Sequence, residues 1–185
     1  MQARTVKDLR AAKEKGVTGV ILSWQNTAGI EDRYDFLRIF SDLGVRIMQL
    51  TYVKPLILAP GSADPFLSIS YNTQNYSGTG YTELNDSGLT GFGREVVTEM
   101  ARVGIACDLS HVGPKTSADV IAFAPEGKPP CFSHILPCGL KEHPRNKSDE
   151  LIKAIGAKGG FVGLSQFGPH MKKVRCNFVE GLVVY

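Results

Sequence analysis

The chain has 185 residues, of which 43% are apolar and 21% charged, and its formal net charge is +3. This composition is that of an ordinary globular protein and excludes a disordered tail, and the length suits one domain or a part of a larger one. No run of about 18 apolar residues could form a transmembrane helix, and no apolar signal core follows Met1. The default expectation is therefore a cytoplasmic location, although the sequence does not identify the compartment. The small positive charge is spread along the chain and gives no basis for nucleic-acid binding.

Apolar periodicity predicts alternating helices and strands. The predicted helices cover residues 5–15, 31–43, 90–103, 115–123 and 148–157, and the predicted strands cover residues 17–22, 45–50, 105–109, 130–133 and 160–164. Loops after strands are longer than loops after helices, as in parallel α/β sheets, whose ligand sites lie at the carboxyl ends of the strands. The predicted class is therefore α/β. Because five strands do not close a barrel of eight, a barrel built from them would be an incomplete (β/α)8 TIM barrel.

Two segments depart from this alternation. Residues 53–71 carry three prolines and the apolar run Leu56 to Leu58, which an ordinary loop would expose to solvent. The residues that follow, 72–87, are rich in Gly, Asn and Ser and are predicted to form a polar loop after a strand.

The four cysteines form no CxxC pair. They are Cys107, Cys131, Cys138 and Cys176. A chain this long and this poor in cysteine does not suggest a disulfide framework. Because Cys107 and Cys131 lie in apolar runs typical of strands, we expect reduced and partly buried thiols.

Two histidines end consecutive predicted strands. His111 closes the sequence CDLSH, and His134 closes CFSH. Because neighbouring parallel strands end at one rim, both imidazoles are expected within reach of one metal ion, and zinc favours such nitrogen ligands. Either histidine alone is better explained as a hydrogen-bonded residue at a strand end, whereas the matched pair favours a metal site.

Two charged residues accompany the histidines. Asp108 precedes His111 in the same predicted strand and could orient an imidazole or belong to a packed polar network, and the sequence does not decide between these roles. Arg145 lies in EHPRNKSDE, just before a predicted helix. A guanidinium at such a rim can bind a carboxylate through paired hydrogen bonds, although a loop arginine is more often solvated.

Six motifs follow one another with regular spacing: GVRIMQLTY, GLTGFGREVVTEMARVG, DLSHVGPKTS, the FSH strand end, HPRNKSDE and GGFVGLS. Together they resemble the renal (membrane) dipeptidase family of zinc peptidases, peptidase family M19, over most of residues 1–170. The resemblance implies a (β/α)8 TIM barrel of the metallo-dependent hydrolase type, roughly twice as long as this chain. It also implies two zinc ions bridged by a glutamate and a hydroxide that attacks the peptide carbonyl of a dipeptide, with an arginine holding the free carboxylate.

Carried over by position, the resemblance implies that His111 and His134 are ligands of one zinc site and that Arg145 binds the substrate carboxylate. Gln25 stands at the position of the bridging glutamate, and because a neutral amide cannot bridge two cations, the affinity for the second metal should be lower. Tyr52 replaces a substrate-binding histidine and could donate a hydrogen bond to the substrate carbonyl. The family's His-x-Asp pair and late aspartate have no counterpart, so no catalytic residue is assigned.

The leading hypothesis is a zinc-dependent dipeptidase that cleaves dipeptides through metal-bound hydroxide, truncated and impaired as given. One or two zinc ions are its expected cofactors, a dipeptide is its expected partner, and a homodimer is one assembly that it could form. One alternative is a non-catalytic product, a partial barrel with exposed strand edges. Another is a related barrel hydrolase with a different substrate.

The resemblance also divides the chain. Residues 1–173 are expected to be the central part of the barrel, interrupted by the insert at 53–71, and residues 174–185 to be an unrelated tail. Both the insert and the tail begin with Val followed by a basic residue, and the codons of these residues can form an intron donor site. We therefore hypothesise that both segments are translated intron.

Overall fold

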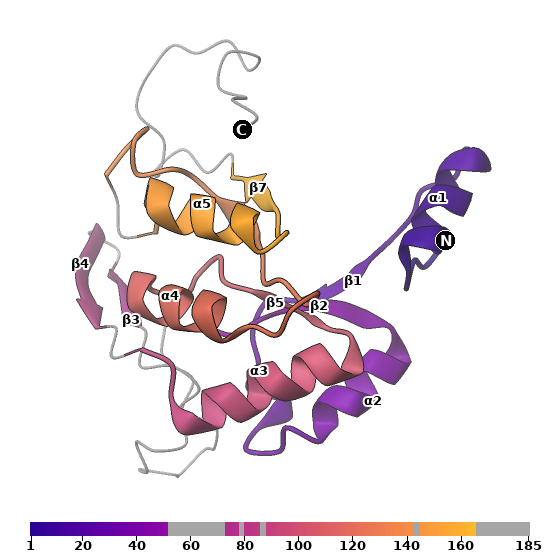
Figure 1. Cartoon of the computed structure of the whole chain (residues 1–185), viewed down its shortest axis with the longest axis horizontal. Coiled ribbons are helices and arrows are strands. Elements are labelled where there is room, and N and C mark those ends of the chain that lie inside the picture. The colour runs from indigo at the N-terminus through magenta and orange to yellow at the C-terminus, as the bar shows by residue number, and fades with distance from the viewer. Residues whose placement is uncertain (52–72, 78–79, 86–87, 143–144, 166–185) are drawn as a thin grey trace.

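Helices and strands alternate along the chain in an α/β fold with parallel strands (Figure 1). The structure is a computed structural model that describes residues 1–51, 73–77, 80–85, 88–142 and 145–165. The helices are α1 (Val6–Glu14), α2 (Phe36–Leu43), α3 (Gly91–Val103), α4 (Pro114–Phe123) and α5 (Asp149–Ala157), with a 3-10 turn, η1, at Ala28–Ile30. The strands are β1 (Leu22–Trp24), β2 (Val45–Gln49), β3 (Thr73–Ser77), β4 (Gly80–Asn85), β5 (Ala106–Asp108), β6 (Phe132–Ile135) and β7 (Val162–Leu164).

The parallel strands form an open arc in chain order. β2 pairs with β1 on one side and with β5 on the other, and β6 pairs with β7. A parallel bridge between Asp108 and Cys131 joins the end of β5 to the chain just before β6. There the amide of Leu109 donates to the Cys131 carbonyl at 2.8 Å, and the amide of Cys131 donates to the Cys107 carbonyl at 2.9 Å. The strands within the described residues do not close into a barrel.

The two faces of this arc differ in polarity. In the register of β2 and β5, Met48 lies opposite Cys107, and Gln49 lies opposite Asp108. Side chains alternate between the faces of a sheet, so each pair shares one face. Met48 and Cys107 belong to the hydrophobic core together with Val96 and Met100 of α3. Gln49 and Asp108 are buried polar residues on the opposite face, where the candidate site lies.

Helices α2 to α5 cover the apolar face, each against the next in chain order (Figure 1). Helix α3 begins and ends as predicted: the Thr90 hydroxyl accepts a hydrogen bond from the Gly93 amide at 2.9 Å. Its last turn closes on Gly104, whose φ of +80° favours glycine. Helix α1 extends away from this layer with the start of the chain (Figure 1). No helix in the described part of the chain combines the length and the hydropathy that a membrane span needs.

Several predicted elements differ from the structure. The helix predicted from residue 31 begins only at Phe36, and Glu31, the residue after η1, has a φ of +52° that is incompatible with a helix. The strand predicted at 17–22 lies instead at Leu22–Trp24, and its side chains are exposed rather than buried. Among the described strands β1 pairs only with β2, so its other edge is uncovered.

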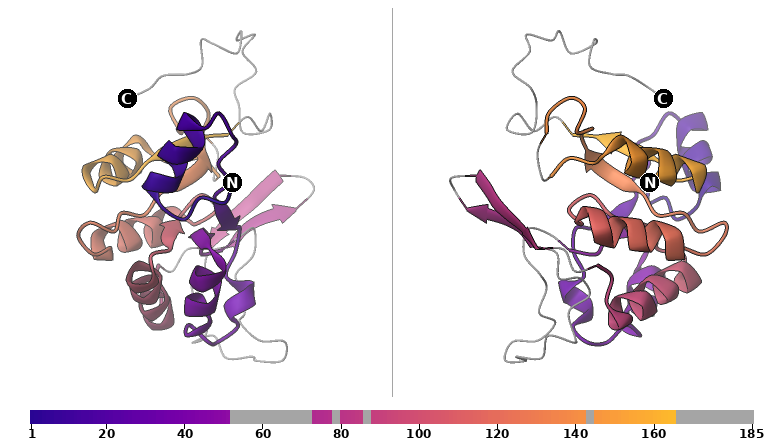
Figure 2. Two further views of the ribbon diagram at one scale, coloured as in Figure 1. Left: turned by 90° about the vertical axis from the view of Figure 1, so that its right-hand side faces the viewer. Right: turned by 60° about the vertical axis from the view of Figure 1, so that its left-hand side comes forward.

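The third difference is an antiparallel hairpin where a polar loop was predicted. β3 pairs with β4, with Thr73 opposite Asn85 and Ser77 opposite Gly80, and the hairpin stands away from the helices in both views of Figure 2. Thr and Tyr favour strands, and a Gly-Thr pair between two such runs is a hairpin signal that the polar composition obscured.

The three described cysteines, Cys107, Cys131 and Cys138, are free, as predicted. Several other predictions fall on parts of the chain outside the described residues. They concern Tyr52, Cys176, the insert at 53–71 and the tail at 174–185, and they stay predictions.

Candidate metal centre

The two histidines converge at the carboxyl ends of β5 and β6. Their Nε2 atoms lie 3.0 Å apart, with the ring centroids 5.0 Å apart and the rings inclined by 57°. His111 follows β5 and is buried, whereas His134 is half-buried. The strand predicted at 130–133 lies at Phe132–Ile135, so His134 is part of β6 rather than the residue that follows it. The structure thus brings both rings to one rim, and their role as metal ligands stays a prediction.

The geometry and the charge state of the pair fit a metal ion. Two nitrogen ligands at about 2.0–2.1 Å from a tetrahedral zinc lie roughly 3.3 Å apart, which is close to the separation of the two Nε2 atoms. Burial lowers the pKa of His134, and the positive charge of Arg145 lowers it further, against a smaller opposing effect of Asp108. His134 is therefore held neutral, which is the form that ligates metal.

Gln25 lies beside this pair, and its expected place at the bridging position stays a prediction. Its Nε2 is 3.3 Å from the Nε2 of His134, and its backbone carbonyl accepts a hydrogen bond from Gln49 Nε2 at 2.9 Å. Gln49 is fully buried and also donates to the carbonyl of Thr51. One buried amide therefore ties the segment after β1 to the end of β2. A carboxamide ligates metal through its oxygen, so the amide nitrogen now facing His134 would have to turn away.

Asp108 is the centre of a polar network, one of the two roles left open by the sequence. Its Oδ1 accepts hydrogen bonds from the amide of Ser110 at 3.0 Å, from the Ser110 hydroxyl at 2.6 Å and from the amide of Ser133 at 3.0 Å. Its Oδ2 accepts from the Ser133 hydroxyl at 2.5 Å. The Ser110 hydroxyl in turn accepts from the amide of His134 at 3.0 Å. One buried carboxylate thus fixes the backbone around both histidines.

Arg145 is buried, at 2% exposure, and is not the solvated loop residue that its position alone would favour. Its Nη2 donates to the carbonyl of His134 at 2.7 Å, and its Nη1 donates to the carbonyl of Ser110. The guanidinium therefore joins the two histidine-bearing segments through their backbones. Its expected contact with a substrate carboxylate stays a prediction.

The sequence reasoning missed three residues of this site, namely Gln49, Ser110 and Ser133. A signal for the two serines was present, since each immediately precedes a histidine of the pair, in LSH and FSH. Within the described residues, no group of three or more His, Cys, Asp or Glu side chains is arranged to hold a metal ion. The described part of the site therefore brings together two candidate nitrogen ligands, His111 and His134.

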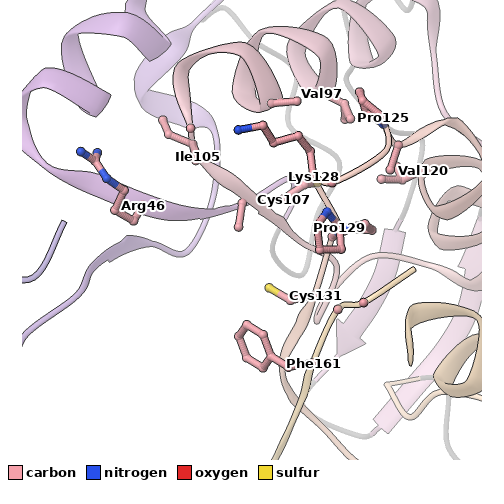
Figure 3. Close-up of a pocket in the computed structure, with 18 residues that line it drawn as sticks. Arg46, Val97, Ile105, Cys107, Val120, Pro125, Lys128, Pro129, Cys131 and Phe161 are labelled. Carbon is pink, nitrogen blue, oxygen red and sulfur yellow. The ribbon is translucent and has the colours of Figure 1, made fainter. Parts of the chain in front are cut away.

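A cavity of about 280 Å³ lies at the other ends of the strands (Figure 3). Its lining includes Ile105, Lys128 and Phe161, which precede β5, β6 and β7, and two buried cysteines, Cys107 and Cys131. Burial raises the pKa of both thiols well above the ordinary value. Because the histidines lie at the carboxyl ends of the same strands, this cavity is separate from the candidate metal centre.

Comparisons with known proteins identify a family for this chain. The family described as membrane dipeptidase (Peptidase family M19) matches residues 1–176. An uncharacterised dipeptidase of Schizosaccharomyces pombe is 29% identical over 165 residues, 89% of this chain and 36% of that protein. Dipeptidase verJ of Clonostachys rogersoniana is 28% identical over 158 residues, 85% of this chain and 36% of verJ.

A solved structure extends the likeness to the fold. An amidohydrolase from Pseudomonas aeruginosa is 46% identical and superimposes with a TM-score of 0.76, covering 94% of this chain and 46% of its own. The chain thus spans 36% of each of these curated relatives and less than half of this solved structure.

Proposed function

Because the chain belongs to the membrane dipeptidase family, peptidase family M19, we propose that it forms part of a zinc-dependent dipeptidase. The observation that carries this proposal is the 3.0 Å approach of the Nε2 atoms of His111 and His134 at the carboxyl ends of adjacent parallel strands. This is where parallel α/β enzymes place their active sites. The open arc of β1, β2, β5, β6 and β7 would be one side of a (β/α)8 barrel.

The chain's own residues would prepare a site for the metal. His111 and His134 would hold it, and the low pKa of His134 keeps that ring in the neutral form. When bound, the metal supplies Lewis-acid chemistry that polarises a carbonyl and activates water. Asp108 and Arg145 would hold the two ligand-bearing segments together from behind, through the backbone contacts already described.

The substrate would be a small peptide with a free carboxylate. Arg145 would be the receptor for that carboxylate, and its positive charge lowers the pKa of His134. Tyr52 would donate to the substrate carbonyl. Gln25, 3.3 Å from His134, stands where a carboxylate would bridge a second ion, and its neutrality weakens that second site.

A two-ligand site predicts modest zinc affinity. Structural zinc sites with four ligands bind with about 10–16 kcal/mol, or roughly 3 kcal/mol per ligand. Two imidazoles then give about 6 kcal/mol, which corresponds to a dissociation constant of tens of micromolar. We expect one weakly bound zinc and little or no turnover from the 185-residue chain.

The test of catalysis is a chimera in which segments of the Pseudomonas aeruginosa amidohydrolase complete the chain. We expect chelator-sensitive hydrolysis of dipeptides, abolished by His111→Ala or His134→Ala, while the exposed-site control Arg102→Gln leaves it unchanged. Dipeptides with amidated carboxyl termini should be poorer substrates. A folded chimera that binds zinc and cleaves no dipeptide would refute the proposal.

A further inference from the structure

Ser133 lies between a carboxylate and a ring of the candidate metal centre. Its hydroxyl is 2.5 Å from Asp108 Oδ2 and 2.7 Å from Nδ1 of His134. Both separations lie within hydrogen-bond range. A serine hydroxyl has a single proton to donate, so the direction of each bond can be worked out from its neighbours.

The carboxylate decides the first direction. Asp108 accepts from two backbone amides and faces two hydroxyls, and an ionised carboxylate has no proton to give. Ser110 gives its proton to Oδ1 at 2.6 Å, and Ser133 gives its proton to Oδ2. The Ser133 oxygen is then an acceptor toward the imidazole. The proton between Ser133 and His134 must therefore sit on Nδ1.

The contacts at the opposite edge of the ring are compatible with the same assignment. Nε2 of His134 faces the amide nitrogen of Gln25 at 3.3 Å and Nε2 of His111 at 3.0 Å. An amide nitrogen can only donate, and a His111 ring with its proton on Nε2 would donate as well. Both contacts are satisfied when Nε2 of His134 carries a lone pair.

We infer that Ser133 is a positioning residue for His134. Its hydroxyl donates to Asp108, accepts from Nδ1 of His134 and thereby holds the ring in the tautomer with a free Nε2 lone pair. The Nε2 atom that carries this lone pair lies 3.0 Å from Nε2 of His111 and is the atom that a metal would bind. Insofar as it concerns metal affinity, the inference rests on the proposed function. The tautomer itself does not depend on it.

The chain offers a matched control in Ser110. Its hydroxyl donates to the same carboxylate and lies 3.1 Å from the Ser133 hydroxyl, but on the histidine side it accepts from the backbone amide of His134. Ser110→Ala and Ser133→Ala each remove one hydroxyl from Asp108. Only the second removes the acceptor for Nδ1.

The experiment is nitrogen-15 NMR of the imidazole rings in the metal-free chain, above the range in which His134 titrates. We expect the wild type and Ser110→Ala to show a protonated Nδ1 and an unprotonated Nε2 for His134. Ser133→Ala should give a mixture of tautomers, and Ser133→Thr, which keeps a hydroxyl, should restore the wild-type form. Zinc affinity, measured by competition with a chelating indicator, should fall about 10- to 100-fold in Ser133→Ala.

The tautomer readout decides the inference. A wild-type His134 protonated on Nε2, an unchanged tautomer in folded Ser133→Ala, or an equal change in Ser110→Ala would overturn it. If the tautomers behave as expected and the wild type binds no zinc, the positioning role stands and the proposed function fails.

Discussion

Replacing Arg145 with alanine should damage the fold and the histidine site together. The guanidinium is 2% exposed and donates to the carbonyls of Ser110 and His134, which belong to different strand ends. Hydrogen bonds from charged donors contribute about 1.5–3 kcal/mol each. Losing two of them and leaving two carbonyls unsatisfied should cost at least about 3 kcal/mol in the free energy of unfolding. For a chain of this size that corresponds to a fall in Tm of roughly 6–12 °C.

The same substitution should raise the pKa of His134. Arg145 is, after burial, the second cause of the lowered pKa of that ring, and its removal also admits water. Arg145→Lys should keep the pKa low, because the charge stays, but should recover only part of the stability, since an ammonium lacks the planar fork that reaches both carbonyls. Urea unfolding and an NMR titration of His134 measure the two effects.

Arg102→Ala on α3 is the matched control, because that guanidinium is 62% exposed and pairs with Glu99 on the surface. It should change stability by less than about 1 kcal/mol and leave the His134 pKa unchanged. The reasoning is wrong if Arg145→Ala melts within about 1 °C of the wild type, or if the His134 pKa stays low without the guanidinium.

Three further predictions concern metal, pH and thiols. His134→Ala should weaken zinc binding about 100-fold, since one ligand contributes roughly 3 kcal/mol. Gln25→Glu should strengthen zinc binding by adding a carboxylate near His134 Nε2. Isothermal calorimetry measures both affinities, and unchanged values would count against the site. The folded pKa of His134 lies below its ordinary value of 6.5. The stability that the neutral ring contributes should therefore be complete above pH 6.5 and be lost as pH falls from there through the folded pKa. Urea midpoints should show this dependence on pH, and His134→Gln should flatten it. Because burial raises the pKa of Cys107 and Cys131, iodoacetamide at pH 8 should label Cys138 in the native chain well before either of them. Peptide mapping that finds equal labelling of the three thiols would contradict the buried placement of Cys107 and Cys131.

The parts of the fold that the sequence predicted are those with local signals. Thr90 and Gly104 mark the ends of α3 because a hydroxyl cap and a left-handed glycine act within one turn of the chain. The meeting of His111 and His134 followed from a topological rule, since parallel neighbours end at the same edge.

The parts that could not be predicted depend on contacts between distant residues. The burial of Arg145 results from carbonyls that lie 35 and 11 positions earlier in the chain, and nothing in its own loop indicates them. In β6 the Ser133 amide is held by Asp108, 25 positions earlier in the chain, and the positive φ of Glu31 keeps that residue out of α2. The burial of Gln49 involves the backbone carbonyl of Gln25, 24 positions earlier in the chain, which no local pattern indicates.

The junction of β5 and β6 has a consequence for local unfolding. Two main-chain hydrogen bonds, at Leu109 and Cys131, and the carboxylate of Asp108 hold these segments side by side. Any fluctuation that separates β5 from β6 also separates the two imidazoles. A metal ion bound by both rings would therefore act as a cross-link between these two strands. At 100 times its dissociation constant such an ion would oppose the opening by about 2.7 kcal/mol. Slower deuterium uptake at these two amides would then report occupancy of the site without any substrate.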